Sequence, residues 1–312
     1  MPRVFAGSAS YPSLSPGPVL TIGNFDGVHQ GHQYLISAVV ERAQALSAPA
    51  CVYTFDPPPR VVLAPDRHQP RIQPWTDRVQ DLGRLGVDEV IIERFTRAFA
   101  QHPPEWFVEE ILGRRIRPRA MVVGYDFRFG RDRSGDADFL RRHLGGAEIY
   151  QVSPHELASG VVSSSRIREA VETGRVREAA ELLGRPHSVR GVVRQGDGRG
   201  RKLGFPTANV HTVAELLPDV GVYAVRVRID GAEWQPGVAN LGTRPTFGGQ
   251  GLSLEVHLLD YSDDLYGREL EVSFVQRLRG EHRFESVTEL VDQIRRDEVQ
   301  ARALLLDGGA SS

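Results

Sequence analysis

Two histidines, His29 and His32, are the side chains of this 312-residue chain whose spacing points most clearly to chemistry. They end a glycine-rich stretch, residues 23–32, that follows the apolar run Val19–Ile22 and leads into an amphipathic segment over residues 34–46. This order predicts a strand, a turn and a helix. Backbone N–H groups are unpaired at a helix start and the helix dipole is positive there, so such a turn attracts phosphate. Imidazoles on the turn can donate hydrogen bonds to phosphate oxygens, more strongly when protonated.

The other residues of this turn suit the same role. Gly23, Gly27 and Gly31 would let the backbone approach an anion without a Cβ clash, and Phe25 and Asp26 lie between them. Two other interpretations stay open. Neighbouring histidines are more often surface residues or satisfied core residues, and a His-x-x-His pair could share a metal ion, although no third Cys or His ligand lies nearby at the usual spacing. The strand before the turn and the helix after it favour the phosphate site.

Composition excludes several classes of protein. The net charge is −2 and the basic residues are dispersed, so there is no charge footprint of a nucleic-acid-binding protein. A single cysteine, Cys51, argues against a disulfide framework and fits a reducing compartment. The N-terminus lacks a secretory signal pattern and no apolar run reaches transmembrane length. We therefore expect a soluble, cytoplasmic globular protein.

Up to about residue 185, short apolar runs alternate with helical periodicity. Such alternation predicts a parallel sheet with right-handed crossovers, and ligands of these sheets bind beyond the carboxyl ends of the strands, where residues 23–32 fall. The expected strands are Val19–Ile22, Ala50–Phe55, 87–92, Ala120–Gly124 and 147–152, and the expected helices are 33–46, 76–86, 104–112 and 136–144.

The pattern changes after residues 185–186. Four segments alternate apolar and polar residues between glycine-rich turns, which predicts an antiparallel barrel or sandwich. These segments are 188–194, Gly221–Ile229, 252–260 and 269–278, and a helix is expected over 286–306. The sequence therefore predicts two domains, residues 1–185 and 186–312.

Three further segments of the first half could carry chemistry. Asp56 is followed by the prolines Pro57, Pro58 and Pro59, which predict a rigid extended loop. The loop could be an ordinary end of a strand or a wall against a flat ring. The fourth strand leads into alternating aromatic and cationic residues, where Phe127 and Phe129 could simply be core and Asp126 could serve a ribose or a metal.

The third segment opens a short helix predicted over residues 166–172. Its hydroxyls, among them Ser164 and Ser165, could be nothing more than helix caps. Arg166 and Arg168 make a phosphate clamp plausible, because hydroxyl and amide donors would face an anion beside fixed positive charge.

On these motifs the first half resembles the HxGH nucleotidyltransferase superfamily, and most closely the FMN adenylyltransferase module of bacterial bifunctional riboflavin kinase/FAD synthetases. The matching motifs span nearly the whole half in the order Gly23-x-Phe25-Asp26-Gly27-x-His29-x-Gly31-His32, Phe55-Asp56-Pro57, Gly124-x-Asp126-Phe127-x-Phe129-Gly130 and Ser163-Ser164-Ser165-Arg166-Ile167-Arg168. Ser165 departs from the family's common Ser-Ser-Thr form but keeps a hydroxyl.

In the second half, residues 191–209 contain five glycines with Arg199, Arg201 and Lys202. Backbone N–H groups there could wrap phosphates, although a solvated basic hairpin is the more common meaning of such spacing. Thr207 and Asn209 supply hard oxygen ligands of the kind Mg²⁺ accepts beside phosphate oxygens. Glu255, on a mostly apolar strand, is either outward-facing and inert or aimed into a site as a base.

This half resembles the riboflavin kinase module, whose fold is a small Greek-key β-barrel with a C-terminal helix. The signature Gly204-Phe205-Pro206-Thr207-Ala208-Asn209 is highly specific, and it is followed by Gly221-Val222-Tyr223, Asn240-Leu241-Gly242-Thr243-Arg244-Pro245-Thr246-Phe247 and Glu255-Val256-His257-Leu258-Leu259-Asp260. Together the two resemblances cover about residues 15–306. They imply that one chain makes FMN from riboflavin and ATP, and then FAD and pyrophosphate from FMN and a second ATP.

The resemblances also imply roles for single residues. In the first half, His29, His32 and Arg168 would act on the transferred phosphates, Gly23, Phe25, Asp26, Gly31, Ser164, Ser165 and Arg166 would bind ATP, and Asp56, Pro57, Asp126, Phe127 and Phe129 would bind flavin. In the second half, Glu255 would be the base, Thr207 and Asn209 would hold Mg²⁺ with ATP, and Gly196, Arg201, Gly204 and Pro206 would bind its phosphates.

Two rival hypotheses were weighed against this one. Only one module could be active, the other serving as a flavin-binding or regulatory domain, but both halves carry intact motifs. A small barrel could bind nucleic acid, but the net charge is near zero and residues 188–278 hold no aromatic stripe. The expected partners are riboflavin, FMN and ATP, with apo-flavoproteins and further copies of the chain as additional candidates, and no nucleic acid or membrane.

Overall fold

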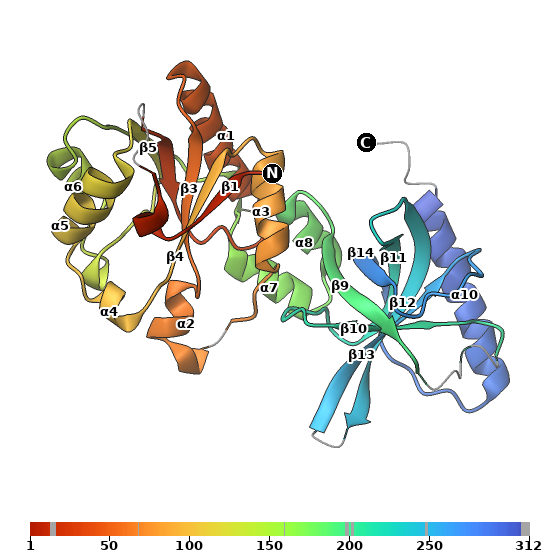
Figure 1. The fold of residues 1–312 in the computed structure, drawn as a ribbon. Helices are drawn as coiled ribbons and strands as arrows, with labels where there is room; N and C mark the ends of the chain where they lie inside the picture. Colours follow the sequence, from red (N-terminus) through yellow and green to blue (C-terminus); the bar gives the residue numbers. More distant parts are fainter. Residues whose placement is uncertain are drawn as a thin grey trace. The chain divides into compact units, whose positions relative to one another are not determined.

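The computed structural model describes residues 1–12, 17–67, 69–158, 160–196, 200, 203–246 and 249–306 (Figure 1). Contacts within the chain divide it into two units, Met1–Ser164 and Ser165–Ser312. Each unit is a fold in its own right and is described separately.

The first unit is built on a parallel sheet of six strands in the order β1-β4-β3-β2-β5-β6. The strands are β1 (Arg3–Ala6), β2 (Val19–Ile22), β3 (Ala50–Phe55), β4 (Glu89–Glu93), β5 (Ala120–Gly124) and β6 (Glu148–Val152). The chain adds strands to one side of β2 and then to the other, so the order reverses between β2 and β5. This reversal is where open parallel sheets bind ligands, beyond the carboxyl ends of the strands.

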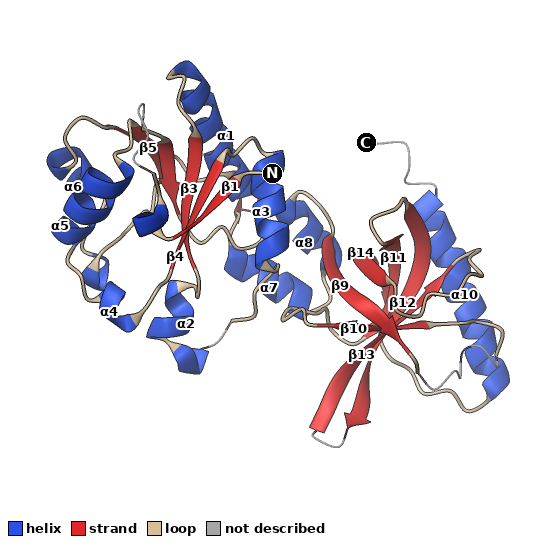
Figure 2. Ribbon diagram, viewed as in Figure 1, coloured by secondary structure: helices blue, strands red, loops and turns tan. Residues whose placement is uncertain are grey.

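Helices cover both faces of this sheet, as Figure 2 shows. They are α1 (Gln30–Ala45), α2 (Pro59–Leu63), α3 (Trp75–Arg84), α4 (Arg97–Ala100), α5 (Pro104–Trp106), a π-helix (Phe107–Ile116) and α6 (Ala137–His143). Successive side chains of β5 point to opposite faces: Ala120 and Val122 pack with α1, and Met121 and Val123 pack with the π-helix and α6. The parallel α/β prediction is confirmed.

Two local predictions in this unit need correction. The chain after Asp56, which precedes a cis peptide bond to Pro57, is extended only as far as Pro58, and α2 begins at Pro59. Proline fits the first turn of a helix because its missing N–H would be unpaired there in any case. The sequence also gave no sign of β1 or of the short hairpin β7–β8 (Glu156–Leu157 and Gly160–Val161), which are too short to show a period.

The second unit is a closed barrel of six antiparallel strands in the order β10-β13-β12-β11-β14-β9. The strands are β9 (His187–Arg194), β10 (Ala208–Thr212), β11 (Gly221–Ile229), β12 (Trp234–Thr246), β13 (Gly249–Leu258) and β14 (Glu269–Arg279). Strands β11, β12 and β13 are successive neighbours and β14 returns beside β11, which is the Greek-key arrangement. The prediction of a Greek-key barrel is confirmed.

The helices of this part of the chain whose bounds the structure describes are α7 (Ser164–Glu172), α8 (Val176–Leu183) and the terminal helix α10 (Val287–Leu306). Ala301 and Leu305 of α10 pack on the outside of the barrel against Val222 and Val238. Four strands were expected and six are present. The pattern missed β12 because Pro236, Gly237 and Gly242 interrupt its alternation. No helix of the described residues is long and apolar enough to cross a lipid bilayer.

Candidate active sites

The turn between β2 and α1 carries the two histidines. His29 is the N-cap of α1, and its Nδ1 accepts a hydrogen bond from the backbone N–H of His32 at 3.3 Å. Because Nδ1 acts as the acceptor, the neutral ring holds its proton on Nε2. His29 therefore offers one N–H donor at a helix N-terminus, which suits a phosphate oxygen.

His32 is held neutral by its surroundings. Its ring stacks on that of His29 with the centroids 3.5 Å apart, and lies edge-on to Phe25 at 5.1 Å. Burial, and then the neighbouring His29 and Arg78, lower the pKa of His32 well below its ordinary value of 6.5. The expectation that both imidazoles act more strongly when protonated therefore does not hold for His32, which can donate only as a neutral ring.

The glycines of the turn have a structural role, and their approach to an anion stays a prediction. A Cβ on Gly23 would lie 3.0 Å from the ring of Phe25, and a Cβ on Gly31 would lie 3.3 Å from the ring of His29. Gly27 has a φ of 86°, in the left-handed region that favours glycine. These glycines thus make room for the neighbouring rings and for the turn itself.

Phe25 and Asp26, predicted to bind ATP, face the protein. Phe25 is 1% exposed and belongs to the core beneath α1. The carboxylate of Asp26 accepts hydrogen bonds from the backbone N–H of Ile72 at 3.2 Å and from Arg78 at 3.0 Å. Ser164 donates its hydroxyl to the backbone oxygen of Asp26 at 3.0 Å, so the structure does bring Ser164 to the turn.

Three other predicted residues of the phosphate site lie beyond the first unit. Ser165, Arg166 and Arg168 are in α7 and belong to the second unit. Arg166 forms an ion pair there with Glu178 at 3.7 Å. Their roles at the phosphates stay predictions.

A cavity of about 710 Å³ opens beside the histidine turn, lined by Gly23 and Asn24. Three predicted flavin-binding residues, Asp126, Phe127 and Phe129, line it as well, whereas Asp56 and Pro57 lie next to lining residues without being among them. A group of aromatic residues that was not predicted also contributes to its wall, namely Phe55, Phe95, Phe99, Trp106 and Phe107. The aromatic-rich stretch over residues 95–107 was the available signal.

In the second unit, Glu255 lies in the middle of β13 and pairs with Asn209 of β10 on one side and Asn240 of β12 on the other. Thr207, just before β10, donates its hydroxyl to the Glu255 carboxylate at 3.3 Å. Thr207, Asn240 and Glu255 line a cavity of about 680 Å³, whose wall also includes Phe205 and Phe284. Glu255 is therefore aimed into a site.

The predicted phosphate-binding residues of this unit are placed as follows. A Cβ on Gly196 would overlap the side chain of Asn209, so glycine is required there for Asn209 to keep its place. Gly204 has a φ of 87° in the turn that leads to Pro206 and Thr207. Arg201 lies outside the described residues.

His257 is a residue of this site that the sequence analysis did not assign. Its Nδ1 lies 2.7 Å from the backbone oxygen of Pro206, and its Nε2 lies 2.9 Å from Glu298 of α10. It thus connects the turn before Thr207 to the terminal helix. Its position two residues after Glu255, on the same face of a strand, was the available signal.

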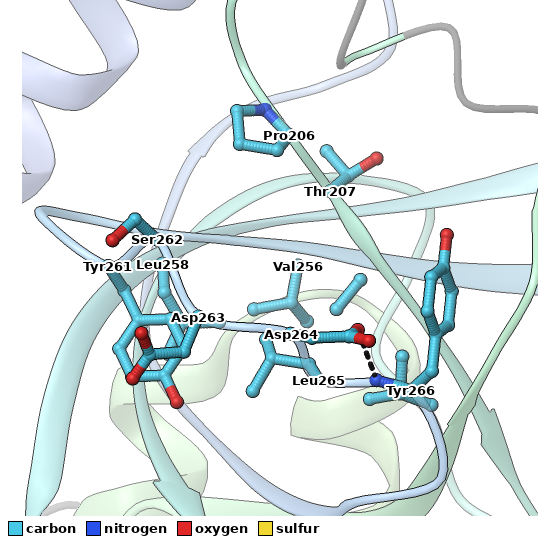
Figure 3. Close-up of a pocket in the computed structure, with 12 residues that line it drawn as sticks. Pro206, Thr207, Val256, Leu258, Tyr261, Ser262, Asp263, Asp264, Leu265 and Tyr266 are labelled. Atoms are coloured by element: carbon cyan, nitrogen blue, oxygen red, sulfur yellow. Dashed lines mark hydrogen bonds between the residues drawn. The ribbon is translucent and has the colours of Figure 1, made fainter.

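A second, smaller hollow of about 90 Å³ adjoins the same turn, and Figure 3 draws the residues that line it. Pro206 and Thr207 come from the turn, and Tyr261 and Tyr266 come from the loop after β13. That loop is held in place by Asp264, which accepts a hydrogen bond from the backbone N–H of Tyr266 at 3.0 Å. Thr207 therefore borders both hollows of the barrel.

The donor set around Glu255 fits Mg²⁺. It consists of a hydroxyl, a carboxamide and a carboxylate, all hard oxygen donors, with Thr207 and Glu255 already in contact. No group of three or more His, Cys, Asp or Glu residues is gathered for a metal in the part of the chain that the structure describes. Such sparse protein ligation suits Mg²⁺, which keeps several waters and shares substrate phosphates.

Comparisons with known proteins agree with this geometry. A family model for FAD synthetase matches residues 12–166 and one for riboflavin kinase matches residues 183–305. The bifunctional riboflavin kinase/FMN adenylyltransferase of Escherichia coli K12 is 42% identical over 290 residues, 92% of each chain. That of Pseudomonas fluorescens is 43% identical over 292 residues, 92% of this chain and 93% of its own. The chain belongs to this bifunctional family.

A solved structure is similar over both units of this bifunctional enzyme. It is described as a macrolide-efflux protein from Streptococcus pneumoniae, and it shares 33% identity and a TM-score of 0.88 over 96% of this chain and 98% of its own. That description differs from the names of the curated relatives. Family membership rests on the two family models and on those relatives, which agree with one another.

The boundary between the two halves of the enzyme falls in different places by different measures. The two family models leave residues 167–182 in neither match, since they end at 166 and begin at 183. Contacts place α7 and α8 with the barrel unit. The predicted boundary between residues 185 and 186 stays a prediction.

The neutrality of His32 predicts a pH dependence of stability. Its pKa is lower in the folded chain than in the unfolded one, so below its ordinary value of 6.5 the unfolded chain takes up a proton that the folded chain does not. As the pH falls below 6.5, this group should therefore lower the free energy of unfolding by up to about 1.4 kcal/mol per pH unit. Between pH 7 and pH 5, the free energy of unfolding measured with urea should fall less steeply for His32→Gln than for the unaltered chain. The exposed control His143→Gln should show the same fall as the unaltered chain. Equal slopes in all three proteins contradict the prediction.

Proposed function

We propose that this enzyme phosphorylates riboflavin to FMN in the barrel unit and adenylylates FMN to FAD in the α/β unit, each step consuming one ATP. The observation that carries the proposal is the contact between Thr207 and Glu255 inside a cavity of the barrel, on a chain whose other half presents the histidine turn. Kinases and nucleotidyltransferases of these two families use ATP, generally with a divalent metal.

In the kinase step, Glu255 accepts the proton of the riboflavin 5′-hydroxyl as that oxygen attacks the γ-phosphorus of ATP and ADP leaves. Thr207 and Asn209 would hold Mg²⁺, which neutralises charge on the phosphates when bound. Phosphoryl transfer depends on positioning and charge neutralisation more than on covalent help. A site with one carboxylate, a hydroxyl and a carboxamide meets this demand.

The two hollows of the barrel suggest how the substrates divide. The reacting hydroxyl must reach Glu255, so riboflavin occupies the cavity of about 680 Å³, where Phe205 and Phe284 can contact its rings. The ATP phosphates must reach Thr207, which also borders the smaller hollow beside Tyr261 and Tyr266. At about 90 Å³ that hollow has room for only a small part of ATP.

In the adenylyl step, a phosphate oxygen of FMN forms a bond to the α-phosphorus of ATP, and the bond from that phosphorus to the leaving pyrophosphate breaks. The FMN phosphate has a second pKa of about 6 and is largely dianionic at neutral pH, so no strong base is needed. His29 and His32 donate N–H groups to the phosphates, with Ser164 as a further donor. The flavin ring lies in the cavity of about 710 Å³ among Phe127 and its aromatic neighbours.

The proposed function also indicates the compartment and the partners of the enzyme. A chain that makes flavin cofactors from small molecules is expected in the cytoplasm, with apo-flavoproteins as recipients of its products. Neither nucleic acid nor a membrane is an expected partner. Self-association is compatible with the proposal but is not needed by it.

The proposal is tested by incubating the protein with riboflavin, ATP and Mg²⁺ and separating the products by chromatography. FMN together with FAD is the expected result. FMN alone limits the enzyme to the kinase step, and the absence of both products rejects the proposal.

Glu255→Gln should remove the proton acceptor of the kinase step while preserving its size. FMN formation should fall by about 10²- to 10⁴-fold, the usual contribution of a general base. Conversion of supplied FMN to FAD should stay at the level of the unaltered chain. Glu269→Gln, on an exposed position of β14, serves as the control. Loss of both activities in Glu255→Gln would show that the two steps do not use separate sites.

His29→Ala should have the opposite effect, because it removes the donor at the start of α1. FAD formation should fall by about 10²- to 10³-fold, the usual effect of removing one donor to a developing oxyanion, and FMN should accumulate. His143→Ala, an exposed histidine of the same unit, is the control. An equal loss of riboflavin turnover in His29→Ala contradicts the assignment of His29 to the adenylyl step.

A further inference from the structure

Arg78 of α3 is fully buried, at 0% exposure, and has no part in the mechanism described so far. Arginine is rarely buried unless it is paired. Its Nη1 donates to the backbone oxygen of Asn24 at 2.9 Å, and its Nη2 donates to the carboxylate of Asp26 at 3.0 Å. Both acceptors belong to the histidine turn. The guanidinium therefore grips that turn at two points from a neighbouring helix.

The same guanidinium is fixed from its own helix. Its Cζ lies 4.3 Å from the ring centre of Trp75, one turn earlier in α3. Asp26 also accepts the backbone N–H of Ile72 with both of its oxygens, at 3.2 Å each. The histidine turn is thus tied to α3 and to the segment just before it by one charged pair and two backbone groups.

A buried ion pair is by itself weak evidence of a contribution to stability. Desolvation offsets the attraction between buried charges, and apolar residues of similar volume often serve a fold equally well. The guanidinium does fix the positions of its two acceptors, because its planar group donates to both of them in one fixed geometry. The segment that it grips needs such support, since Phe25 and Val28 have φ values of 49° and 40°. Non-glycine residues keep this conformation only where the surroundings enforce it.

The gripped segment connects directly to the reacting groups. Asn24 lines the cavity of about 710 Å³, and the backbone oxygen of Asp26 accepts the Ser164 hydroxyl. Three residues later the chain reaches His29, the N-cap of α1. A shift of the turn would therefore move the flavin cavity, Ser164 and the histidines relative to one another.

We propose that Arg78 is the positioning residue of the adenylyl-transfer site, holding residues 24–26 so that His29 and the start of α1 meet the phosphates in the reactive geometry. The inference rests on the proposed function of this unit. Arg78 is too deeply buried to contact either substrate, so its effect is exerted through the turn.

The test compares Arg78→Lys with the unaltered chain. Lysine keeps the charge but cannot reach Asn24 and Asp26 together, so kcat for conversion of FMN to FAD should fall by about 10- to 100-fold, the size of effect that a small misplacement of reacting groups produces. The KM for FMN should be little changed, because the aromatic wall of the cavity remains. Arg84→Lys is the matched control, since Arg84 lies on the same helix, is exposed and pairs only locally with Asp81.

The outcomes separate the possible failures. Equal kcat in Arg78→Lys and the unaltered chain overturns the inference, and so does an FMN affinity that weakens in proportion to kcat without being lost, which is the mark of a purely structural residue. If Arg78→Lys no longer binds FMN, the paired variant Asp26→Asn with Arg78→Met decides, because it removes both charges together. Retained FMN binding with lost kcat in the paired variant supports the inference, and any other result contradicts it. Absence of FAD from the unaltered chain counts against the proposed function itself.

Discussion

The adenylyl half of this enzyme depends on one constraint at strand β2. The strand order of the parallel sheet reverses there, and a tight turn must lead the chain from β2 into α1. The reversal leaves the carboxyl end of β2 open to a ligand, and the turn brings the unpaired N–H groups of the helix to that opening. Phe25, Gly27 and Val28 all have left-handed φ values within the turn. The buried contacts of Phe25 and the pair between Asp26 and Arg78 keep this backbone in place.

In the kinase half, the closed barrel positions the residues of the candidate site, whereas in the adenylyl half a turn between a strand and a helix does so. A six-stranded barrel has no free edges, so a residue in the middle of β13 necessarily has a neighbour on each side. Glu255 lies between Asn209 and Asn240 for this reason, and Thr207 reaches its carboxylate from the turn before β10. His257 then fixes that turn to α10. The barrel therefore presents oxygen donors at one point without a dedicated metal cage.

Sequence reasoning succeeded where the signal was local. The strand, turn and helix around His29 follow one another within a few residues, and the barrel motifs are contiguous, so both could be predicted. It failed where a contact joins distant residues. The sequence could not show that Asp26 pairs with Arg78, which lies 52 positions away, and β12 was not predicted because proline and glycine break its alternation. The aromatic wall of the cavity of about 710 Å³ comes from segments far apart in the sequence, so no local pattern could predict the whole wall.

The two halves also distribute charge as their substrates require. A riboflavin hydroxyl has a proton to lose, and under the proposed function the Glu255 carboxylate of the barrel would accept it. The FMN phosphate is already an anion, and a free carboxylate beside it would repel it. Asp26 is the sole acidic residue of the turn over residues 23–32, and its ion pair with Arg78 cancels that charge. Because His32 is also held neutral, N–H donors and the helix dipole are the means by which the turn would bind phosphates under the proposed function.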